Sequence, residues 1–146
     1  MATTKTLTAA NSALSLLVRG LFPTPQAIQG YATDDSFAAD DVNPVEVQMG
    51  VDGLMSAGYV PYSTKFNITL QADSPSTAMF DTVLAYQKAN LTPVIFDGTL
   101  IIGGTQEKYA LTKGFLTAAT PMSSAKKMLQ PRKFTIEFQD VTKAPI

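Results

Sequence analysis

The sequence predicts a mainly β protein, an antiparallel β-sandwich or barrel with one flanking α-helix and extended hairpins. Several segments alternate apolar and polar residues with a period of two, which is the pattern of half-buried strands. An Asp-Gly pair occurs twice between such segments, and glycine tolerates the positive φ of tight turns. Apolar residues recur at helical spacing over residues 75–89, which predicts one amphipathic helix.

The extended segments are separated by short breaks. We expect strands, in chain order, at 12–19, 27–33, 45–49, 54–60, 65–70, 94–96, 100–102, 109–120 and 132–141. Two prolines should break the chain at 21–25, and the acidic stretch 34–43 reads as an exposed loop. Asp52-Gly53 and Asp97-Gly98 are the expected hairpin turns.

Three further local features are expected. Gly58 lies inside a strand pattern, where glycine marks a bulge or a close backbone approach. Ser74 is the expected N-cap of the helix, with Pro75 in its first turn. Residues 121–130 read as a loop or a short helical turn.

The composition points to a single domain with a partner. The 146 residues fit one domain, 1–146, with residues 1–12 as an N-terminal arm. Charged residues make up 16%, below the usual quarter, so we expect apolar or Thr/Ser-rich surface to meet a partner. The alternative is that hydroxyl groups solvate the surface of a Thr-rich β protein. The apolar run 13–18 is too short for a signal peptide or a membrane span, so we expect a soluble chain without membrane contact, made in the cytoplasm.

The chain contains no histidine and no cysteine. This excludes disulfides and zinc–thiolate sites, and it removes the usual general base. We therefore expect no enzyme and no catalytic, cofactor-binding or metal-binding residues. Asp52 and Asp97 could pair as glycosidase carboxylates do, but turn geometry explains both. The aspartates of 34–41 lack the glycine and the closing glutamate of an EF-hand, so a solvated loop is favoured over calcium binding.

Charge is unevenly spread along the chain. Residues 1–60 have two basic and six acidic side chains, a balance of −4, whereas residues 107–146 have seven basic and three acidic, a balance of +4. If these segments lie on different faces, copies could stack head to tail; if they intermix in space, the charges cancel. The basic pairs at 126–127 and 132–133 could touch nucleic acid, but without stacking aromatic residues a solvated or subunit-facing patch is favoured.

Residues 42–141 resemble the tail tube proteins of long-tailed phages. The matching parts are the GVDG turn at 50–53, the small-residue return strand, the alternating FNITL strand, the helix after Ser74-Pro75 and the closing RKFTIEF strand. The resemblance implies a virion structural protein that forms stacked, usually hexameric rings around a lumen through which DNA enters the host. The tube proteins of contractile injection systems and of type VI secretion share this design, and the length of the chain favours a contractile tail.

The resemblance assigns roles to the 45–55 region and implies partners. Glu46 and Gln48 are candidates for lumen-facing positions. The candidates for contacts between subunits or rings are Met49, Asp52, Gly53, Leu54 and Met55. The implied partners are other copies of the chain, together with sheath, tape measure and baseplate proteins, and genomic DNA would pass through the lumen without specific binding. The alternative function is a monomeric ligand-binding β-sandwich, an accessory protein of a baseplate or fibre.

Overall fold

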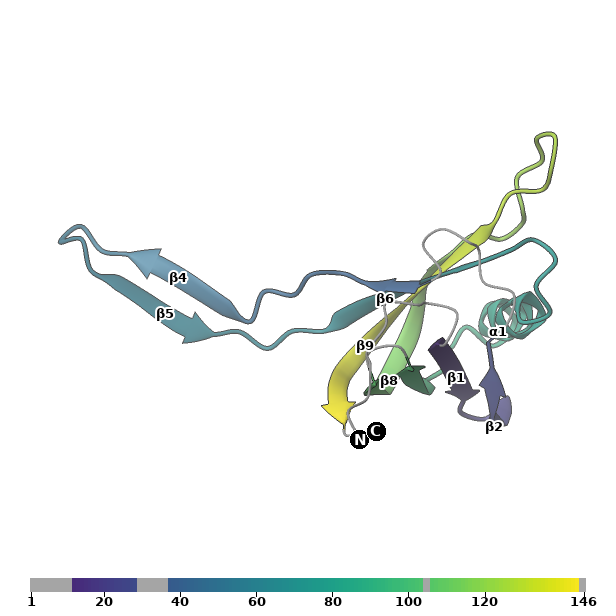
Figure 1. The fold of residues 1–146 in the computed structure, drawn as a ribbon, viewed down its shortest axis with the longest axis horizontal. Coiled ribbons are helices and arrows are strands. Elements are labelled where there is room, and N and C mark those ends of the chain that lie inside the picture. The colour runs from purple at the N-terminus through teal and green to yellow at the C-terminus, as the bar shows by residue number, and fades with distance from the viewer. Residues whose placement is uncertain (1–11, 29–36, 104–105, 145–146) are drawn as a thin grey trace, which may run out of the picture.

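The computed structural model describes residues 12–28, 37–103 and 106–144. Figure 1 shows a body made of a curled antiparallel sheet with one helix, from which a long two-stranded hairpin projects. The elements are β1 Ser12–Val18, β2 Phe22–Ala27, β3 Phe37–Ala39, β4 Val45–Met49, β5 Met55–Tyr59, β6 Thr64–Leu70, α1 Thr77–Asn90, β7 Phe96–Ile102, β8 Glu107–Ala119 and β9 Arg132–Ala144. The body sheet has seven strands in the order β2-β1-β7-β8-β9-β6-β3, and β4 pairs only with β5.

The core lies against one face of this sheet. Alternate residues of β1, β6 and β9 are buried, and they join residues of α1 in one hydrophobic cluster. Since β1 and β6 lie near opposite edges of the sheet, a shared cluster requires the sheet to curl around it. The helix covers this core, and the ring of Phe80 stacks on that of Phe134 with centroids 4.2 Å apart. The expected mainly β fold with one flanking helix is confirmed.

The helix lies where the sequence places it, but its start differs by a few residues. Its buried face is Met79, Phe80 and Val83, as the helical spacing predicts. The regular α-helix has Ser76 at its N-cap position, and the Ser76 side chain makes no capping hydrogen bond. Ser74 lies one turn earlier, where its Oγ accepts a hydrogen bond from the Ser76 backbone N–H. The expected capping bond of Ser74 is therefore present, although the regular helix begins two residues later than expected.

The prolines of 21–25 do not break the chain as expected. They lie in β2, which is an edge strand of the sheet. The Ile28 backbone N–H bonds to the Leu14 carbonyl, so by alternation Pro25 turns its ring nitrogen away from β1. An edge strand tolerates proline on that open side because no ladder bond is lost there. The strand expected at 27–33 does not begin at residue 27, because Ala27 is the last residue of β2. Residues 29–33 lie outside the described part.

The second Asp-Gly pair does not form a hairpin turn. Asp97 and Gly98 lie inside the continuous strand β7. Opposite Asp97, β8 contains one extra residue, and Lys113 there has a φ of 50°, which marks a bulge. Asp97 accepts a hydrogen bond from the Lys113 backbone N–H and pairs with Arg19 at 2.7 Å. Its carboxylate therefore serves the bulge and an ion pair, which the turn signal alone did not indicate.

Part of the expected acidic loop is also a strand. β3 pairs with β6, and the ring of Phe37 stacks on Phe66 with centroids 6.1 Å apart. Asp40 accepts a hydrogen bond from the side-chain amide of Asn67. Asp34 and Asp35 lie outside the described residues. The large apolar side chain of Phe37 thus draws this stretch onto the sheet edge.

We expect Gly114→Ala to destabilise the body. A Cβ at this position would lie 2.5 Å from the ring of Phe138, which is fully buried. The overpacking should lower the free energy of unfolding by about 1–3 kcal/mol in urea titrations. Gly58→Ala is the matched control, since a Cβ there meets no atom within 4 Å. Equal stability of the two variants would contradict this packing.

The ion pair of Asp97 should make stability depend on acid pH. The hydrogen bond from Arg19 lowers the pKa of Asp97 below its ordinary value. The resulting stabilisation is complete above the unfolded-state pKa and is lost as the pH falls through the folded-state pKa. Asp97→Asn should therefore be less stable than the wild type at pH 7 in urea titrations, and the difference should shrink toward pH 3. A difference independent of pH would show that the charge of Asp97 contributes nothing.

Candidate assembly surface

The projecting hairpin, residues 45–59, is the most exposed part of the described chain. All residues of β4 and β5 are exposed, and the hairpin points away from the body in Figure 1. The sequence pattern predicted a half-buried strand at 45–49, and within one described chain this is wrong. Its alternation nonetheless gives the hairpin two chemically different faces.

The strand register sorts the side chains of the projecting hairpin onto these faces. Directly opposed residues share a face, and the pairs run from Val45↔Tyr59 to Met49↔Met55. The apolar face consists of Val45, Val47, Met49, Met55, Ala57 and Tyr59. The polar face consists of Glu46, Gln48, Ser56 and Gly58. Met49 and Met55 are 64% and 63% exposed, so the apolar face lies uncovered by the described chain.

The tip of the projecting hairpin, residues 50–54, is longer than a two-residue turn. The Gly53 backbone N–H bonds to the Gly50 carbonyl, and Gly53 has a φ of 85°. The side chain of Asp52 accepts a hydrogen bond from the Leu54 backbone N–H, which explains its place in the turn. Val51 and Leu54 are exposed at the tip. The Gly50 backbone N–H also bonds to the Leu54 carbonyl at 2.7 Å, so the chain reverses over residues 51–53, and the expected tight turn at Asp52-Gly53 is confirmed as a three-residue loop.

The site residues that the sequence predicted lie on different parts of the projecting hairpin. Glu46 and Gln48 share the polar face, whereas Met49 and Met55 form a pair on the apolar face. Asp52, Gly53 and Leu54 lie in the tip. Gly58 stands in regular register with Glu46, so the expected bulge is absent there, and no described atom comes close to it. The roles assigned to these residues stay predictions.

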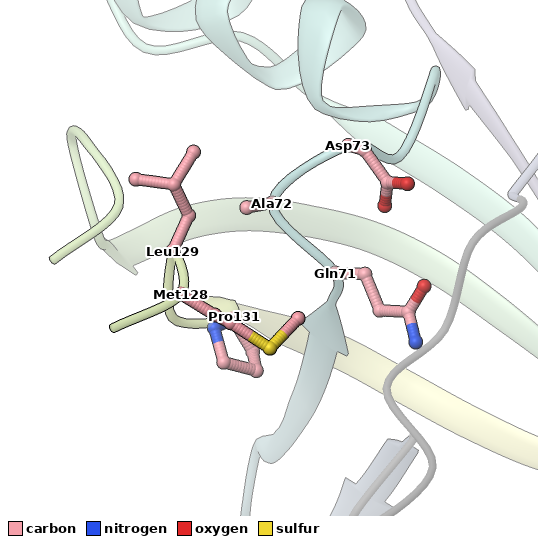
Figure 2. A pocket seen from close by; sticks show the side chains of 6 residues that line it. All are labelled: Gln71, Ala72, Asp73, Met128, Leu129 and Pro131. Carbon is pink, nitrogen blue, oxygen red and sulfur yellow. The ribbon is translucent and has the colours of Figure 1, made fainter. Parts of the chain in front are cut away.

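A second exposed apolar site lies in the loop between β8 and β9. Its exposed large side chains are Met122, Met128 and Leu129. A cavity of about 530 Å³ beside this loop is lined by Gln71, Ala72, Asp73, Met128, Leu129 and Pro131, as Figure 2 shows. We call it the loop pocket. The sequence analysis missed it, although a methionine and a leucine directly after two lysines in a loop were a signal.

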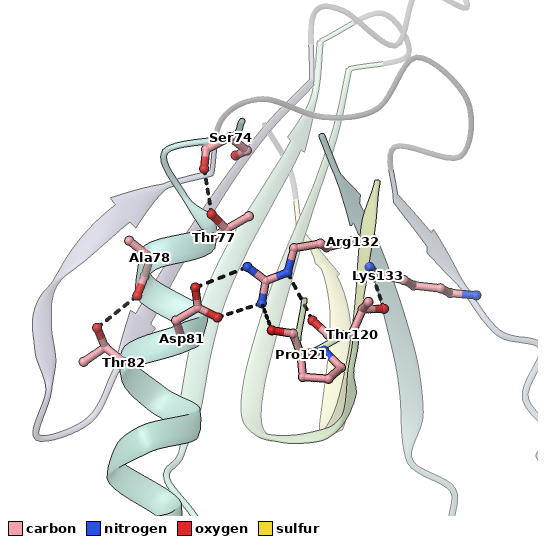
Figure 3. A network of polar contacts seen from close by, with 9 residues as sticks. All are labelled: Ser74, Thr77, Ala78, Asp81, Thr82, Thr120, Pro121, Arg132 and Lys133. Carbon is pink, nitrogen blue, oxygen red and sulfur yellow. Dashed lines mark hydrogen bonds and ion pairs between the residues drawn. The ribbon is translucent and has the colours of Figure 1, made fainter. Parts of the chain in front are cut away.

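The β8–β9 loop is held to the body by Arg132. This residue is buried, and its guanidinium pairs with Asp81 of α1 at 2.6 Å. It also donates hydrogen bonds to the carbonyls of Thr120 and Pro121, as Figure 3 shows. Within the loop, the Gln130 backbone N–H bonds to the Ser124 carbonyl. Hydrogen bonds therefore hold the β8–β9 loop, which forms one wall of the loop pocket, both at its base and within the loop.

The same geometry divides the basic cluster that the sequence suggested. Lys126 and Lys127 are exposed on the β8–β9 loop, whereas Arg132 points inward to Asp81. The four basic residues of 126–133 thus do not form one exposed patch.

The structure places the two carboxylates that the sequence suggested as a pair in different parts of the molecule. Asp52 lies at the tip of the projecting hairpin and Asp97 in the body, so the structure does not bring these two carboxylates together. In the described ranges, no group of three or more acidic side chains is placed to hold a metal ion. None of the helices in the described part has the length and apolar character to cross a membrane.

Comparison with known families identifies the chain. The sequence pattern of the family described as Tail fiber protein gp32 matches residues 5–142. The chain belongs to this family. Membership makes it a tail structural protein, in agreement with the resemblance to tail proteins. No curated protein matches the sequence.

Solved structures with a similar fold come from contractile assemblies. A chain of the anti-feeding prophage cap, a tube terminating cap, has a TM-score of 0.60 and 12% identity over 100% of this chain and 95% of its own. A chain of the anti-feeding prophage baseplate has a TM-score of 0.57 and 15% identity over 99% and 98%. A chain of the PVC sheath/tube terminator has a TM-score of 0.58 and 14% identity over 90% and 92%. At these identities the likeness shows a shared fold.

We expect Asp81→Ala to destabilise the tail protein. The variant leaves the buried guanidinium of Arg132 with carbonyl groups as hydrogen-bond partners and without a charge partner, which should cost about 1–3 kcal/mol in unfolding free energy. Asp73→Ala removes an exposed aspartate and serves as the control in the same urea titrations. A loss below about 0.5 kcal/mol for Asp81→Ala, the range of ordinary surface changes, would show that the pair does not brace the loop.

Proposed function

We propose that this protein is a tail tube subunit whose copies form stacked, closed rings in which every projecting hairpin contacts a neighbouring subunit. The observation that carries the proposal is the uncovered apolar face of the projecting hairpin. Isolated two-stranded hairpins are marginal in water, and exposed apolar patches mark sites of association. A neighbouring subunit is the partner that a symmetric assembly supplies to every copy.

The energetics favour burial of this face between copies. Fully burying one side chain of the Val or Met class contributes about 1.5–3 kcal/mol. The apolar face offers several such side chains in a row, among them Val45, Val47 and Met49. Ring closure repeats the contact at every subunit, so a modest contribution per side chain becomes a stable ring.

The polar face then has a defined place in the assembly. If the apolar face lies on a neighbour, Glu46, Gln48 and Ser56 point away from it, toward the lumen. Glu46 is the charged residue of this face, and its carboxylate repels phosphate groups, so that genomic DNA passes without specific binding. This role needs no catalysis and no cofactor, and it places the protein in the virion tail beside sheath, tape measure and baseplate proteins.

The β2 edge of the body sheet supports closure through the hairpin. β2 forms one edge, and its Pro25 presents no N–H on the open side. A neighbouring strand could not form a regular ladder there. The projecting hairpin offers the alternative, because its outer strand edges carry no proline within 45–59.

A terminator or cap subunit is the second candidate function. The similar folds of the tube terminating cap and of the sheath/tube terminator favour it. A terminator closes a tube once, whereas a tube subunit stacks repeatedly. Electron microscopy of the purified chain separates the two, since tubes of constant diameter support the first and single rings support the second.

Val47→Lys tests the role of the apolar face. It puts a charge into the proposed contact and should raise the concentration needed for ring assembly by about tenfold or more, equal to about 1.4 kcal/mol. Analytical ultracentrifugation measures this, and thermal unfolding checks the body. Gln48→Lys is the matched control, because it adds the same charge one residue away on the polar face. Equal assembly of both variants would contradict the proposal, as would a wild-type chain that stays monomeric at high concentration.

A further inference from the structure

We propose that the tip of the projecting hairpin docks into the loop pocket of a second copy, in the next ring. The inference rests on the proposed function, because it names the contact by which rings stack. The two sites are the exposed apolar tip, with Val51 and Leu54, and the pocket beside Met128 and Leu129.

Position within the fold requires that the two sites meet between copies. The projecting hairpin leads into the start of β6 at Thr64, and the β8–β9 loop leads into β9 at Arg132. In the β6–β9 ladder Thr64 pairs with Phe138, whereas Leu70 pairs with Arg132. The hairpin and the loop therefore leave opposite ends of one ladder, as Figure 1 shows. A tip at one end and a pocket at the other form a heterologous contact that repeats along an axis.

Shape and apolar character fit the occupant. The loop pocket holds about 530 Å³ and has the apolar side chains of Ala72, Met128, Leu129 and Pro131 in its wall. This volume accommodates several apolar side chains of a tip. Methionine adapts its shape to the group that it contacts. The wall is also preformed, because Arg132 holds the base of the loop and Ala125 bridges to Leu129 within it.

Charge favours the same pairing. Residues 45–62 carry Glu46 and Asp52 and no basic residue, whereas residues 121–131 carry Lys126 and Lys127 and no acidic residue. Asp73 lines the far side of the loop pocket from Met128 and Leu129, so the attraction comes from the loop. Opposite charges at the rim of an apolar contact set its orientation and register. A second copy of this chain supplies both halves of the match.

Engineered cysteines test the contact directly, because the natural chain has none. Val51→Cys with Met128→Cys should give a ladder of disulfide-linked oligomers after mild oxidation of assembled protein. Within one copy the two positions lie on opposite projections, so each bond must join two copies. Val51→Cys with Lys88→Cys, on the exposed side of α1, is the control and should give no ladder. Ladders in both variants, or in neither, would overturn the inference.

A charge reversal gives a second readout that separates this contact from ring formation. Lys127→Glu should leave rings intact but shorten stacked tubes severalfold at low salt in electron micrographs. Lys88→Glu makes the same change of charge on α1 and should leave tube length unchanged. If Lys127→Glu forms tubes as long as those of the wild type, the proposed attraction between the acidic hairpin and the basic loop is wrong. Intact rings of the Val51→Cys/Met128→Cys variant without a 51–128 link would overturn the docking alone, whereas an absence of rings in the wild type would overturn the proposed function.

Discussion

The ladder between β6 and β9 is the constraint on which the rest of the structure depends. It pairs Thr64 with Phe138 at one end and Leu70 with Arg132 at the other, without a register shift. Its inward side chains, among them Ile68 and Ile136, are completely buried. A one-residue slip would turn these side chains to solvent, so the register is firmly specified. Because the hairpin and the β8–β9 loop leave opposite ends of this ladder, its register also fixes where the two assembly surfaces lie.

The body and the two projections follow different physical rules. The body buries its apolar residues under α1, and the Phe80–Phe134 stack and the Arg132–Asp81 pair join the helix to the start of β9. The projections expose apolar residues instead: Val47 and Met49 on the hairpin, Met128 and Leu129 on the loop. Exposed apolar surface of this kind is typical of sites of association. The proposed contacts between copies would account for both the low charge content and the exposed projections.

The sequence predicted regular elements better than it predicted their surroundings. Alternation in β9 and helical spacing in α1 are local properties of the backbone period, so both elements were found. β2 and β3 were missed because proline and aspartate are poor strand formers, and only pairing at the sheet edge makes these segments strands. The Asp97-Gly98 pair was misread for a related reason. A turn signal is local, whereas its carboxylate is satisfied by Arg19 and by the backbone of Lys113 from β8.

The sequence by itself determined the mainly β class, the single flanking helix, the absence of histidine and cysteine chemistry, and the two-faced pattern of 45–49. It could not determine whether the body of the same chain covers the apolar face of that pattern, because alternation shows only that the two faces differ. The tertiary structure decided this by carrying 45–59 away from the body, where no described residue covers the apolar face. The tertiary structure also forms the loop pocket, because it brings residues of 71–73 beside residues of 128–131. Such a site depends on strand order and register, and these are set by packing between distant segments.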